Sequence, residues 1–484
     1  MSILKNISIL FLLFFISFAV AQEKDKKEYK KRVLETAEVD FISSYYSQDG
    51  NNASVTGGIG NEHLTDVASS IVISLPLNAD DVLTVEAGFS AYTSASSSNG
   101  NPFDTSGASR NGGDDDDDEY DDKRAVASNT IGSPWVASSG ASKSDVWTTV
   151  NMAYAHSSDS RNFTWDSHVS FSSEYDYTSF GFGGGILQQF NEKNTSIGIS
   201  GSVYLDTWDP VYPTELKSYN DVNGNLNLGF FSGISILNQN GNQSKSWRPK
   251  NGFDKIQNKE RNSFSASVSF SHIINKRAQI SVFADFVQQQ GWLANPLQRV
   301  YFADIANYYI GNASSISNYG SKQNSDVFQL ADDIERLPNT RFKIPIGMRF
   351  NYYINEMFVL RTYYRYYSDN WGITSQTASV EVPVKITDKF TLYPSYRYYI
   401  QTAANYFAPF EKHLSTQNYY TSDFDLSAYN SMQLGVGISY TDIFTKSHLW
   451  KFGLKSVDVK LYQYKRNSGF NSGIINVGMK FIMD

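Results

Sequence analysis

Hydrophobic and polar residues alternate with a period of two along much of this chain. Successive side chains of a β-strand leave opposite faces, so this period predicts strands with two unlike faces. Between Phe358 and Tyr367, the even-numbered positions are mostly apolar or aromatic, whereas the odd-numbered positions include Arg361 and Arg365. We call each such set of alternate positions a parity. One face of this strand suits an apolar environment, and the other suits water.

The same pattern predicts seventeen strands over most of the chain after residue 38. The predicted strands are 39–46, 64–76, 81–95, 146–156, 162–174, 178–190, 195–207, 225–237, 262–274, 278–290, 340–354, 357–369, 373–386, 389–402, 430–442, 448–464 and 470–483. The weakest is 225–237, which also fits a loop. Without it sixteen remain, the even number that a bacterial barrel needs to have both ends in the periplasm.

Short and long connections alternate between these strands. Tight turns rich in Asn, Asp and Pro, such as "SLPLNADDV" and "YINEM", alternate with the long connections 96–145, 207–261, 291–339 and 403–429. This asymmetry is typical of outer-membrane barrels, with short periplasmic turns and long extracellular loops. Placing residue 38 on the periplasmic side places all the tight turns there as well.

The N-terminus predicts export. Residues 1–21 have one lysine, an apolar stretch and an Ala-Val-Ala cleavage site, which is the pattern of a secretory signal peptide. Residues 22–37 are predicted to be a charged periplasmic segment, and 38–484 to be the barrel. The chain has no cysteine, which excludes disulfides, thiol chemistry and a lipoprotein anchor.

Composition agrees with a β-rich membrane protein. Aromatic residues make up 15% of the chain and the mean hydropathy is −0.38, as expected where every strand alternates. A soluble sandwich could also turn its polar faces to water. The signal peptide, the turn asymmetry and the closing strand favour an all-β fold, a transmembrane antiparallel β-barrel of about 16 strands. In that closing strand, Ile475, Val477, Met479 and Phe481 are in phase and resemble the C-terminal signal of the barrel-assembly machinery, although Asp484 replaces the usual final aromatic.

Charged residues of the wettable parity are predicted to line the lumen. They are Arg341, Lys343, Arg349, Arg361, Arg365, Glu381, Lys385 and Arg397. Salt bridges that stiffen the wall are the first explanation of such a set. An anion-selective or anion-binding strip is the second, since arginine binds phosphate and carboxylate through two parallel hydrogen bonds.

An acidic run interrupts the extracellular loop 96–145. It contains Asp114, Asp115, Asp116, Asp117, Asp118, Glu119, Asp121 and Asp122. Such a run repels itself and stays solvated, and it lacks the spacing of a calcium-binding loop. A solvated loop is therefore expected, with loose association of divalent cations as the alternative.

The sequence offers no catalytic or metal-binding motif. The six histidines have no metal-ligand spacing, and neither G-x-S-x-G nor H-E-x-x-H occurs. No cofactor is expected, and an enzyme has the weakest support of the functions considered. The net charge of −8 and the export signal also speak against nucleic acid as a partner.

Several segments resemble the signature of a known family. They are "WDPVYPTEL", "GWLANPLQRVYF", "LPNTRFKIPIGMRFNYYI", "YRYYSDNWGI", "YYTSDFDLS" and the two copies of "SGAS" at 106–109 and 139–142. They are similar to a Bacteroidota outer-membrane family known only as a domain of unknown function. The resemblance implies an outer-membrane barrel associated with small lipoproteins, thioredoxin-like proteins and flavin-transferring enzymes, and it brings no catalytic residues.

The leading functional hypothesis is a porin-like pore in the outer membrane of a Gram-negative, Bacteroidota-like bacterium. The alternative is a scaffold barrel with a plugged lumen in an envelope complex linked to redox proteins. The third is an outer-membrane enzyme. In each case the expected partners are membrane lipid and, during biogenesis, the barrel-assembly machinery.

Overall fold

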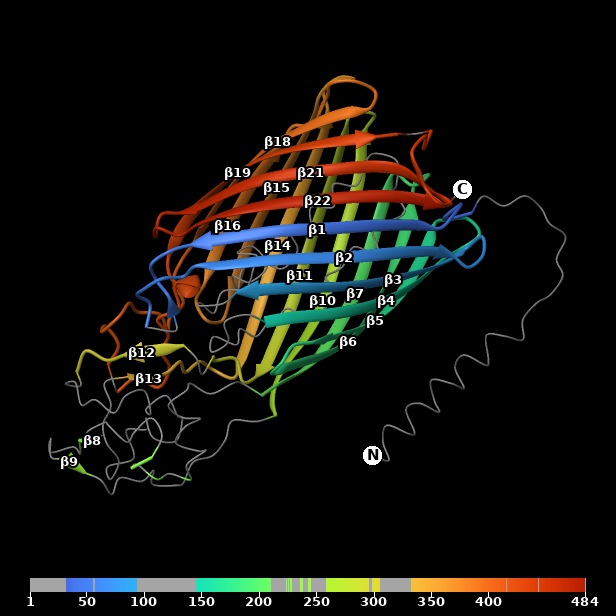
Figure 1. The fold of residues 1–484 in the computed structure, drawn as a ribbon. Helices are drawn as coiled ribbons and strands as arrows, with labels where there is room; N and C mark the ends of the chain where they lie inside the picture. Colours follow the sequence, from blue (N-terminus) through green and yellow to red (C-terminus); the bar gives the residue numbers. More distant parts are fainter. Residues whose placement is uncertain are drawn as a thin grey trace, which may run out of the picture.

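A computed structural model describes residues 32–54, 57–93, 145–209, 258–295, 298–304, 332–414, 416–442 and 444–483, with a few short stretches between 223 and 244. Within these residues one sheet of 18 strands dominates, and two of its strands, β17 (Val384–Lys385) and β20 (His448–Leu449), have only two residues. The other sixteen form the wall of a closed antiparallel barrel (Figure 1). The predicted fold class is confirmed.

The wall strands follow one another in chain order. They are β1 (Glu38–Asp49), β2 (Leu64–Pro76), β3 (Asp81–Thr93), β4 (Asp145–Ser157), β5 (Phe163–Ser173), β6 (Tyr177–Phe190), β7 (Thr195–Trp208), β10 (Lys259–Asn275), β11 (Ala278–Gly291), β14 (Thr340–Tyr353), β15 (Val359–Asp369), β16 (Thr374–Glu381), β18 (Phe390–Gln401), β19 (Tyr429–Thr441), β21 (Phe452–Arg466) and β22 (Asn471–Met483). The barrel closes where β22 pairs antiparallel with β1, with Phe41 opposite Met479. Closure leaves no free sheet edge, as a barrel in a bilayer requires.

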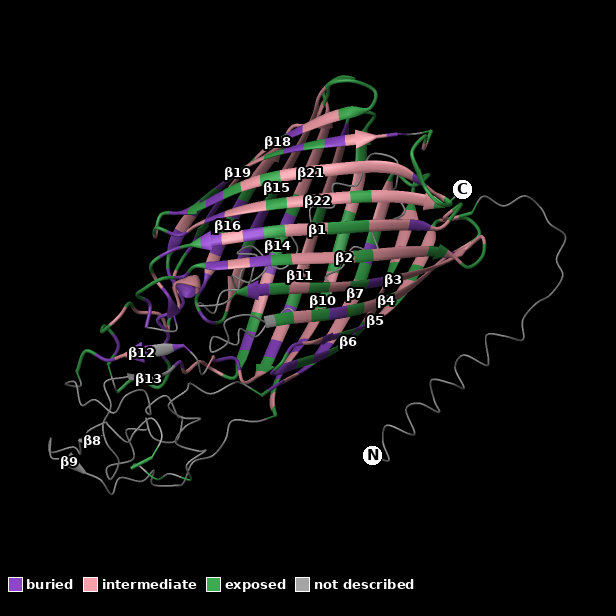
Figure 2. Cartoon of the chain, in the orientation of Figure 1, coloured by how far each residue is buried: buried purple, intermediate pink, exposed green. Residues whose placement is uncertain are grey.

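Alternation along the strands is confirmed by burial. On β14, Phe342, Ile346 and Met348 are exposed, whereas Arg341 and Gly347 are buried. Most exposed apolar side chains of the other wall strands belong to the same outward parity, and Figure 2 shows the resulting mixture of exposure classes along each strand. The apolar parity therefore covers the outside, and the polar parity faces the interior.

Two predicted strands are shorter than expected. The predicted strand 373–386 is interrupted after Glu381, because Pro383 has no backbone N–H to donate to the ladder. The predicted strand 448–464 begins at Phe452, because the chain turns at Trp450, which has a positive φ of 56°.

Most of the weakest predicted strand, 225–237, lies outside the described residues. The wall passes directly from β7 to β10. Within the segment, β8 (Ile236–Leu237) pairs with β9 (Gln243–Ser244) in a separate sheet of two strands. A wall of sixteen strands without this segment agrees with the even count.

The two ends of the barrel differ. The turn end has the connections 77–80, 158–162, 191–194, 276–277, 354–358, 382–389 and 442–451. The loop end has the connections 50–63, 94–144, 174–176, 209–258, 292–339, 370–373, 402–428 and 467–470. Three of the loop-end connections are as short as turns, so the asymmetry comes from the other five.

A second pair of strands and one short helix lie in the loop-end connections. The strands are β12 (Arg299–Tyr301) and β13 (Asp332–Ile334), and the helix is the 3-10 helix η4 (Phe424–Leu426). Among the residues that the structure describes, no helix has the length and apolar character to cross a membrane.

Candidate functional site: the barrel interior

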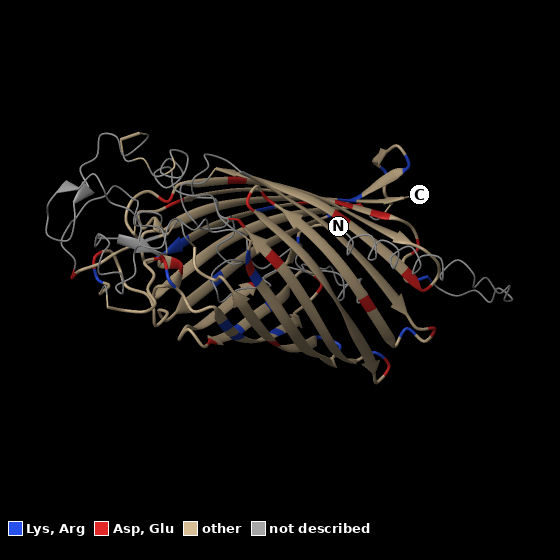
Figure 3. Ribbon diagram, turned by 90° about the horizontal axis from the view of Figure 1, so that it is seen from below, with Lys and Arg blue, Asp and Glu red and all other residues tan. Residues whose placement is uncertain are grey.

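Basic residues are concentrated on the interior side of β14, β15 and β18. Arg349 lies opposite Tyr363, Tyr363 lies opposite Ser379, and Ser379 lies opposite Arg397. Because neighbouring strands are about 4.8 Å apart, this row separates the two arginines by about 14 Å around the wall. In Figure 3 most of the wall is tan, with charged residues in short segments of the strands and at the two ends.

Arg349 is held against aromatic rings. Its guanidinium carbon lies 6.0 Å from the ring centre of Phe283 and 5.8 Å from that of Tyr363. These two rings stack on each other, with centres 6.1 Å apart. Aromatic faces attract a cation without neutralising its charge, so Arg349 keeps its positive charge at a fixed place in the wall.

Arg361 has a carboxylate partner. Its Nη1 lies 3.1 Å from Oε1 of Glu381 on the neighbouring strand, and both side chains are partly exposed. This is the wall-stiffening ion pair that the first explanation predicts. The pair reduces the net positive charge of this part of the wall.

The remaining predicted residues occupy three different environments. Arg365 is buried between Gly347 and Thr377, whereas Lys343 and Arg397 are half-buried in the wall. Lys385 lies at the turn end, exposed, with its Nζ 3.0 Å from Oδ1 of Asp388. The eight predicted residues therefore do not form one strip.

The neighbouring part of the wall, on the other side of β11, is lined by small residues. Along β6, β7 and β10, the interior parity consists largely of glycine and serine. One cross-strand row joins Gly183, Ser202 and Ser265, and the next joins Gly185, Ser200 and Ser267. The interior thus has a basic, aromatic sector and, one strand away, a sector lined by small and hydroxyl-bearing residues.

Part of the interior is accessible space. Ile42 on β1 shares the interior parity with Ser70 and Gly478, its neighbours on both sides. Its side chain is nevertheless 46% exposed. Among the described residues, no side chain fills the space over Ile42, so this part of the interior is accessible.

Described segments of several loop-end connections pack together into a cap. We define the cap as the described residues of 50–63, 292–304, 332–339 and 402–428. Backbone hydrogen bonds interlock its segments: Ala303 N donates to His413 O at 2.8 Å, Tyr420 N donates to Arg336 O at 2.8 Å, and Glu335 N donates to Gln298 O at 2.9 Å. Figure 2 shows buried residues gathered at this end of the barrel.

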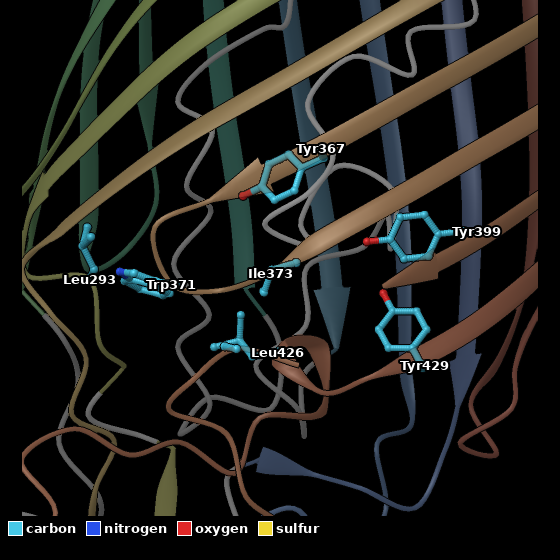
Figure 4. Close-up of a cluster of buried hydrophobic side chains, with 8 residues drawn as sticks. Leu293, Tyr367, Trp371, Ile373, Tyr399, Leu426 and Tyr429 are labelled. Carbon is cyan, nitrogen blue, oxygen red and sulfur yellow. The ribbon is translucent and has the colours of Figure 1, made fainter. Parts of the chain in front are cut away.

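An apolar cluster joins the cap to the wall. It consists of Leu293, Tyr367, Trp371, Ile373, Tyr399, Ala404, Leu426 and Tyr429, most of which are labelled in Figure 4. These residues come from β15, β18 and β19, from η4, and from the connections that follow β11, β15 and β18. The cap is therefore packed like a small hydrophobic core.

Asp369 organises the tight connection between β15 and β16. Its Oδ1 accepts hydrogen bonds from the backbone N–H groups of Trp371 and Ile373, at 3.0 and 2.9 Å. Its Oδ2 accepts from Tyr367 at 2.7 Å and from Arg341 at 2.9 and 2.5 Å. The guanidinium of Arg341 also covers the ring of Trp371 at 4.3 Å. Arg341, predicted to line the lumen, thus stabilises the wall where it meets the cap.

A tyrosine followed two residues later by a polar side chain recurs at the loop end of four strands. The hydroxyl of Tyr46 donates to Gln48 at 2.9 Å, that of Tyr399 to Gln401 at 2.5 Å, and that of Tyr367 to Asp369. In the fourth strand, Nε of Arg466 donates to the hydroxyl of Tyr464 at 2.9 Å. Both members of each pair face the interior, and together they form a layer beneath the cap.

Sequence reasoning did not identify this layer. A sequence motif could have identified the layer: Tyr-x-Gln, Tyr-x-Asp or Tyr-x-Arg at the end of a predicted strand. The acidic run, Asp114 to Asp122, lies outside the described residues. Among the residues that are described, no group of three or more His, Asp or Glu side chains is arranged to hold a metal ion.

Comparisons with solved structures find other barrels. The chain is similar to a bacterial polysaccharide outer membrane secretin (TM-score 0.41, 11% identity, covering 93% of this chain and 99% of that chain). It is also similar to Pseudomonas aeruginosa OccK2 in complex with glucuronate (TM-score 0.37, 7% identity, covering 94% and 98%). A third similar structure is the ferric enterobactin receptor PfeA (TM-score 0.37, 9% identity, covering 91% and 55%). At these identities and TM-scores, no property of those proteins is transferred to this chain.

No curated protein matches the sequence. One family model, described as "Protein of unknown function (DUF3570)", matches residues 7–476.

Proposed function

This chain belongs to the DUF3570 family of proteins of unknown function, and we propose that it is an integral outer-membrane channel with an arginine-bearing lumen. The observation that carries the proposal is the combination of an apolar outer surface with a polar interior whose middle is accessible. A closed barrel of this kind places its apolar belt in lipid and leaves a wet path through the membrane. The resemblance to a Bacteroidota family extends the proposal to the outer membrane of such a bacterium.

Arg349 and Arg397 are the best candidates for ion selectivity. Both face the interior on the same cross-strand row. Basic residues in a pore attract anions and repel cations, and the effect weakens with salt. We therefore expect a preference for anions rather than a binding site for one solute.

Planar-bilayer recording of the purified protein tests the proposal. Stepwise conductance with an anion preference is the expected result. A protein that inserts correctly and yet conducts at no pH, salt concentration or voltage would contradict the channel.

The orientation of the barrel has its own test. We propose that the loop end faces the outside of the cell. The exposed Thr416, changed to Cys, is then expected to react with a membrane-impermeant thiol reagent in intact cells. The chain has no native cysteine that could react instead.

A scaffold with a closed lumen is the second candidate, and the cap is the observation that favours it. An apolar cluster and interlocked backbone hold several loop-end connections together, and such packing supports a barrel that holds partners instead of passing solutes. Small lipoproteins and redox proteins of the envelope are its proposed partners. Co-purification from native membranes, together with the absence of conductance, would favour this candidate over the channel.

A further inference from the structure

Three carboxyl groups are enclosed in the cap. Glu62 and Glu335 are 8% and 3% exposed, and Asp423 is half-buried at the N-terminus of η4. They belong to three different connections of the loop end. Groups that link separate loops of the cap are placed to control whether the loops stay together.

Two of the carboxyl groups bridge cap segments directly. Oε2 of Glu335 accepts the backbone N–H of Asn295 at 2.8 Å. Oδ2 of Asp423 accepts the side-chain amide of Gln298 at 3.3 Å, and Oδ1 accepts the backbone N–H of Asp425 at 3.0 Å. The segment 292–304 is thus tied both to Glu335 and to the loop that carries η4.

Two arginines from the wall face these carboxyl groups. Arg466 on β21 pairs with Asp425 at 2.6 Å and also faces Glu62 and Asp423. Arg261 on β10 faces Glu335, but it also faces Asp176 and Asp206. Six described carboxyl groups, those of Glu62, Glu335, Asp423, Asp425, Asp176 and Asp206, thus lie around these two wall arginines.

Other titratable side chains surround the same place. Tyr46, Tyr429 and Tyr464 face Arg466, and Tyr177 faces Arg261. His413 places Nε2 2.8 Å from Thr421 O and Nδ1 2.8 Å from Oε1 of Gln417. None of these groups supplies a further positive charge directly beside Glu335.

Burial and mutual repulsion raise the affinity of the carboxyl groups for protons. Burial raises the pKa of Glu335 to about 8, and the neighbouring Asp423 adds to the effect. Burial and Asp425 raise the pKa of Asp423 to about 7, and the same two causes raise the pKa of Glu62 to about 7. Desolvation disfavours the charged form of an acid, which is the main cause in all three.

We propose that Glu62, Glu335 and Asp423 form a proton-operated latch that holds the cap closed. While they carry protons, the loops interlock without charge repulsion. When they ionise, the buried negative charges repel one another, which separates the loops and opens the loop end of the lumen. The latch regulates the proposed channel and rests on the proposed function for what passes through it.

The direction of the pH dependence follows from proton linkage. An acid whose pKa is raised in the closed state stabilises that state fully below its ordinary pKa of about 4.3. This stabilisation is lost as the pH rises to the raised pKa. The equilibrium constant between the closed and the open cap falls by about tenfold per pH unit for each group. Above a pH of about 8, the highest of the three pKa values, no further loss is expected.

A cysteine probe measures opening without depending on conductance. Ala404 is 4% exposed within the cap cluster, whereas Thr416 is exposed in the same connection. The full-length protein carries Ala404→Cys or Thr416→Cys, and the rates of reaction with a small maleimide are compared at each pH. The ratio of the two rates cancels the ionisation of the thiol. Ser422→Cys, at a position that is 2% exposed, is a second buried probe if Ala404→Cys does not fold.

The ratio of the labelling rate at the buried cysteine to that at the exposed cysteine is expected to rise at least tenfold between pH 5.5 and pH 8 and then to stay level. This follows because the opening equilibrium changes by about tenfold per pH unit for each group. In the background Glu62→Gln, Glu335→Gln and Asp423→Asn, which imitates the protonated state, the ratio is expected to stay low at pH 8. Glu411→Gln, an exposed acid of the same connection, is the matched control and should leave the rise unchanged.

Two results would overturn the latch: a ratio that does not change with pH, or a rise that persists in the triple variant. Faster migration of unboiled than boiled samples on a denaturing gel checks that each variant is folded. The latch and the channel can fail separately. A pH-dependent ratio without any conductance supports the latch and contradicts the channel, whereas conductance with a constant ratio does the reverse.

Discussion

Two ion pairs on the interior face show how differently the same barrel treats its loop end and the rest of its wall. Arg341 and Asp369 at the loop end have side chains 3% and 0% exposed, whereas Arg361 and Glu381, farther down the wall, are 24% and 16% exposed. Both pairs join adjacent strands, and all four residues share the interior parity. The first pair lies in a dry layer beneath the cap, and the second can contact water.

The difference arises from what covers each pair. Trp371 covers Arg341, and the apolar cluster of the cap lies beside it. In the middle of the barrel no such layer of described residues lies over Ile42. A polar residue of the interior parity therefore has a structural role at one level and is available to solutes at another.

The largest effect is expected when the buried pair loses one partner. Asp369→Ala leaves the Arg341 guanidinium enclosed without its carboxylate, and breaking a buried pair in this way costs about 3–5 kcal/mol. It also removes the acceptor for the N–H groups of Trp371 and Ile373. The temperature at which unboiled protein loses its fast gel migration is expected to fall markedly.

Glu381→Ala is the control for this change. It breaks the solvated pair with Arg361, for which the cost is expected to be about 1 kcal/mol or less. Equal losses of stability from the two changes would show that the loop end and the rest of the wall do not differ as described.

The second largest loss of stability is expected from a substitution in the apolar cluster. Leu426 on η4 is 7% exposed and packs among Trp371, Ala404 and Tyr429. Leu426→Ala is expected to destabilise the cap by about 2–5 kcal/mol, because a cavity remains in a packed cluster. Limited proteolysis of the connection 402–428 reports this loosening.

Leu414 lies in the same connection but is 47% exposed. Leu414→Ala is expected to change stability by no more than about 0.5 kcal/mol, as for ordinary surface positions. If this change loosens the connection as much as Leu426→Ala does, the cap is not held by the cluster.

The smallest effect on stability is expected in the middle of the barrel. Arg349→Ser and Arg397→Ser remove charges from the wet wall, so folding should be retained. Each change is expected to lower the preference for anions over cations roughly twofold in low salt. The effect should be smaller at physiological ionic strength, where charges in water are screened beyond about 8 Å. The reversal potential across a salt gradient measures it.

Lys385→Ser provides the control for this measurement. Lys385 is exposed at the turn end and pairs with Asp388, so its removal should leave selectivity nearly unchanged. A shift as large as that of the wall arginines would move the selective region to the turn end.

Much of the fold could be predicted from the sequence because a period of two is a local property. Phe342, Ile346 and Met348 lie on the outside, and Arg341 and Arg349 lie on the inside, as their parity predicts. The even number of wall strands and the difference between the two ends also follow from strand and turn patterns. Errors occurred where one residue interrupts the pattern, as Pro383 and Trp450 do.

The tertiary structure alone decided which interior residues are dry. Parity places Arg341, Arg361 and Arg365 on one face, but it does not show that Arg341 lies beneath a cap, that Arg361 reaches Glu381, or that Arg365 is buried. Those outcomes depend on contacts between connections far apart in the chain, such as Ala303 with His413 and Arg336 with Tyr420. Alternation is set by the geometry of each strand, whereas burial of a polar side chain depends on every segment that packs against it. The sequence by itself therefore determined the barrel wall, and only the folded loops decided which polar residues of the interior are buried and which of its charges face water.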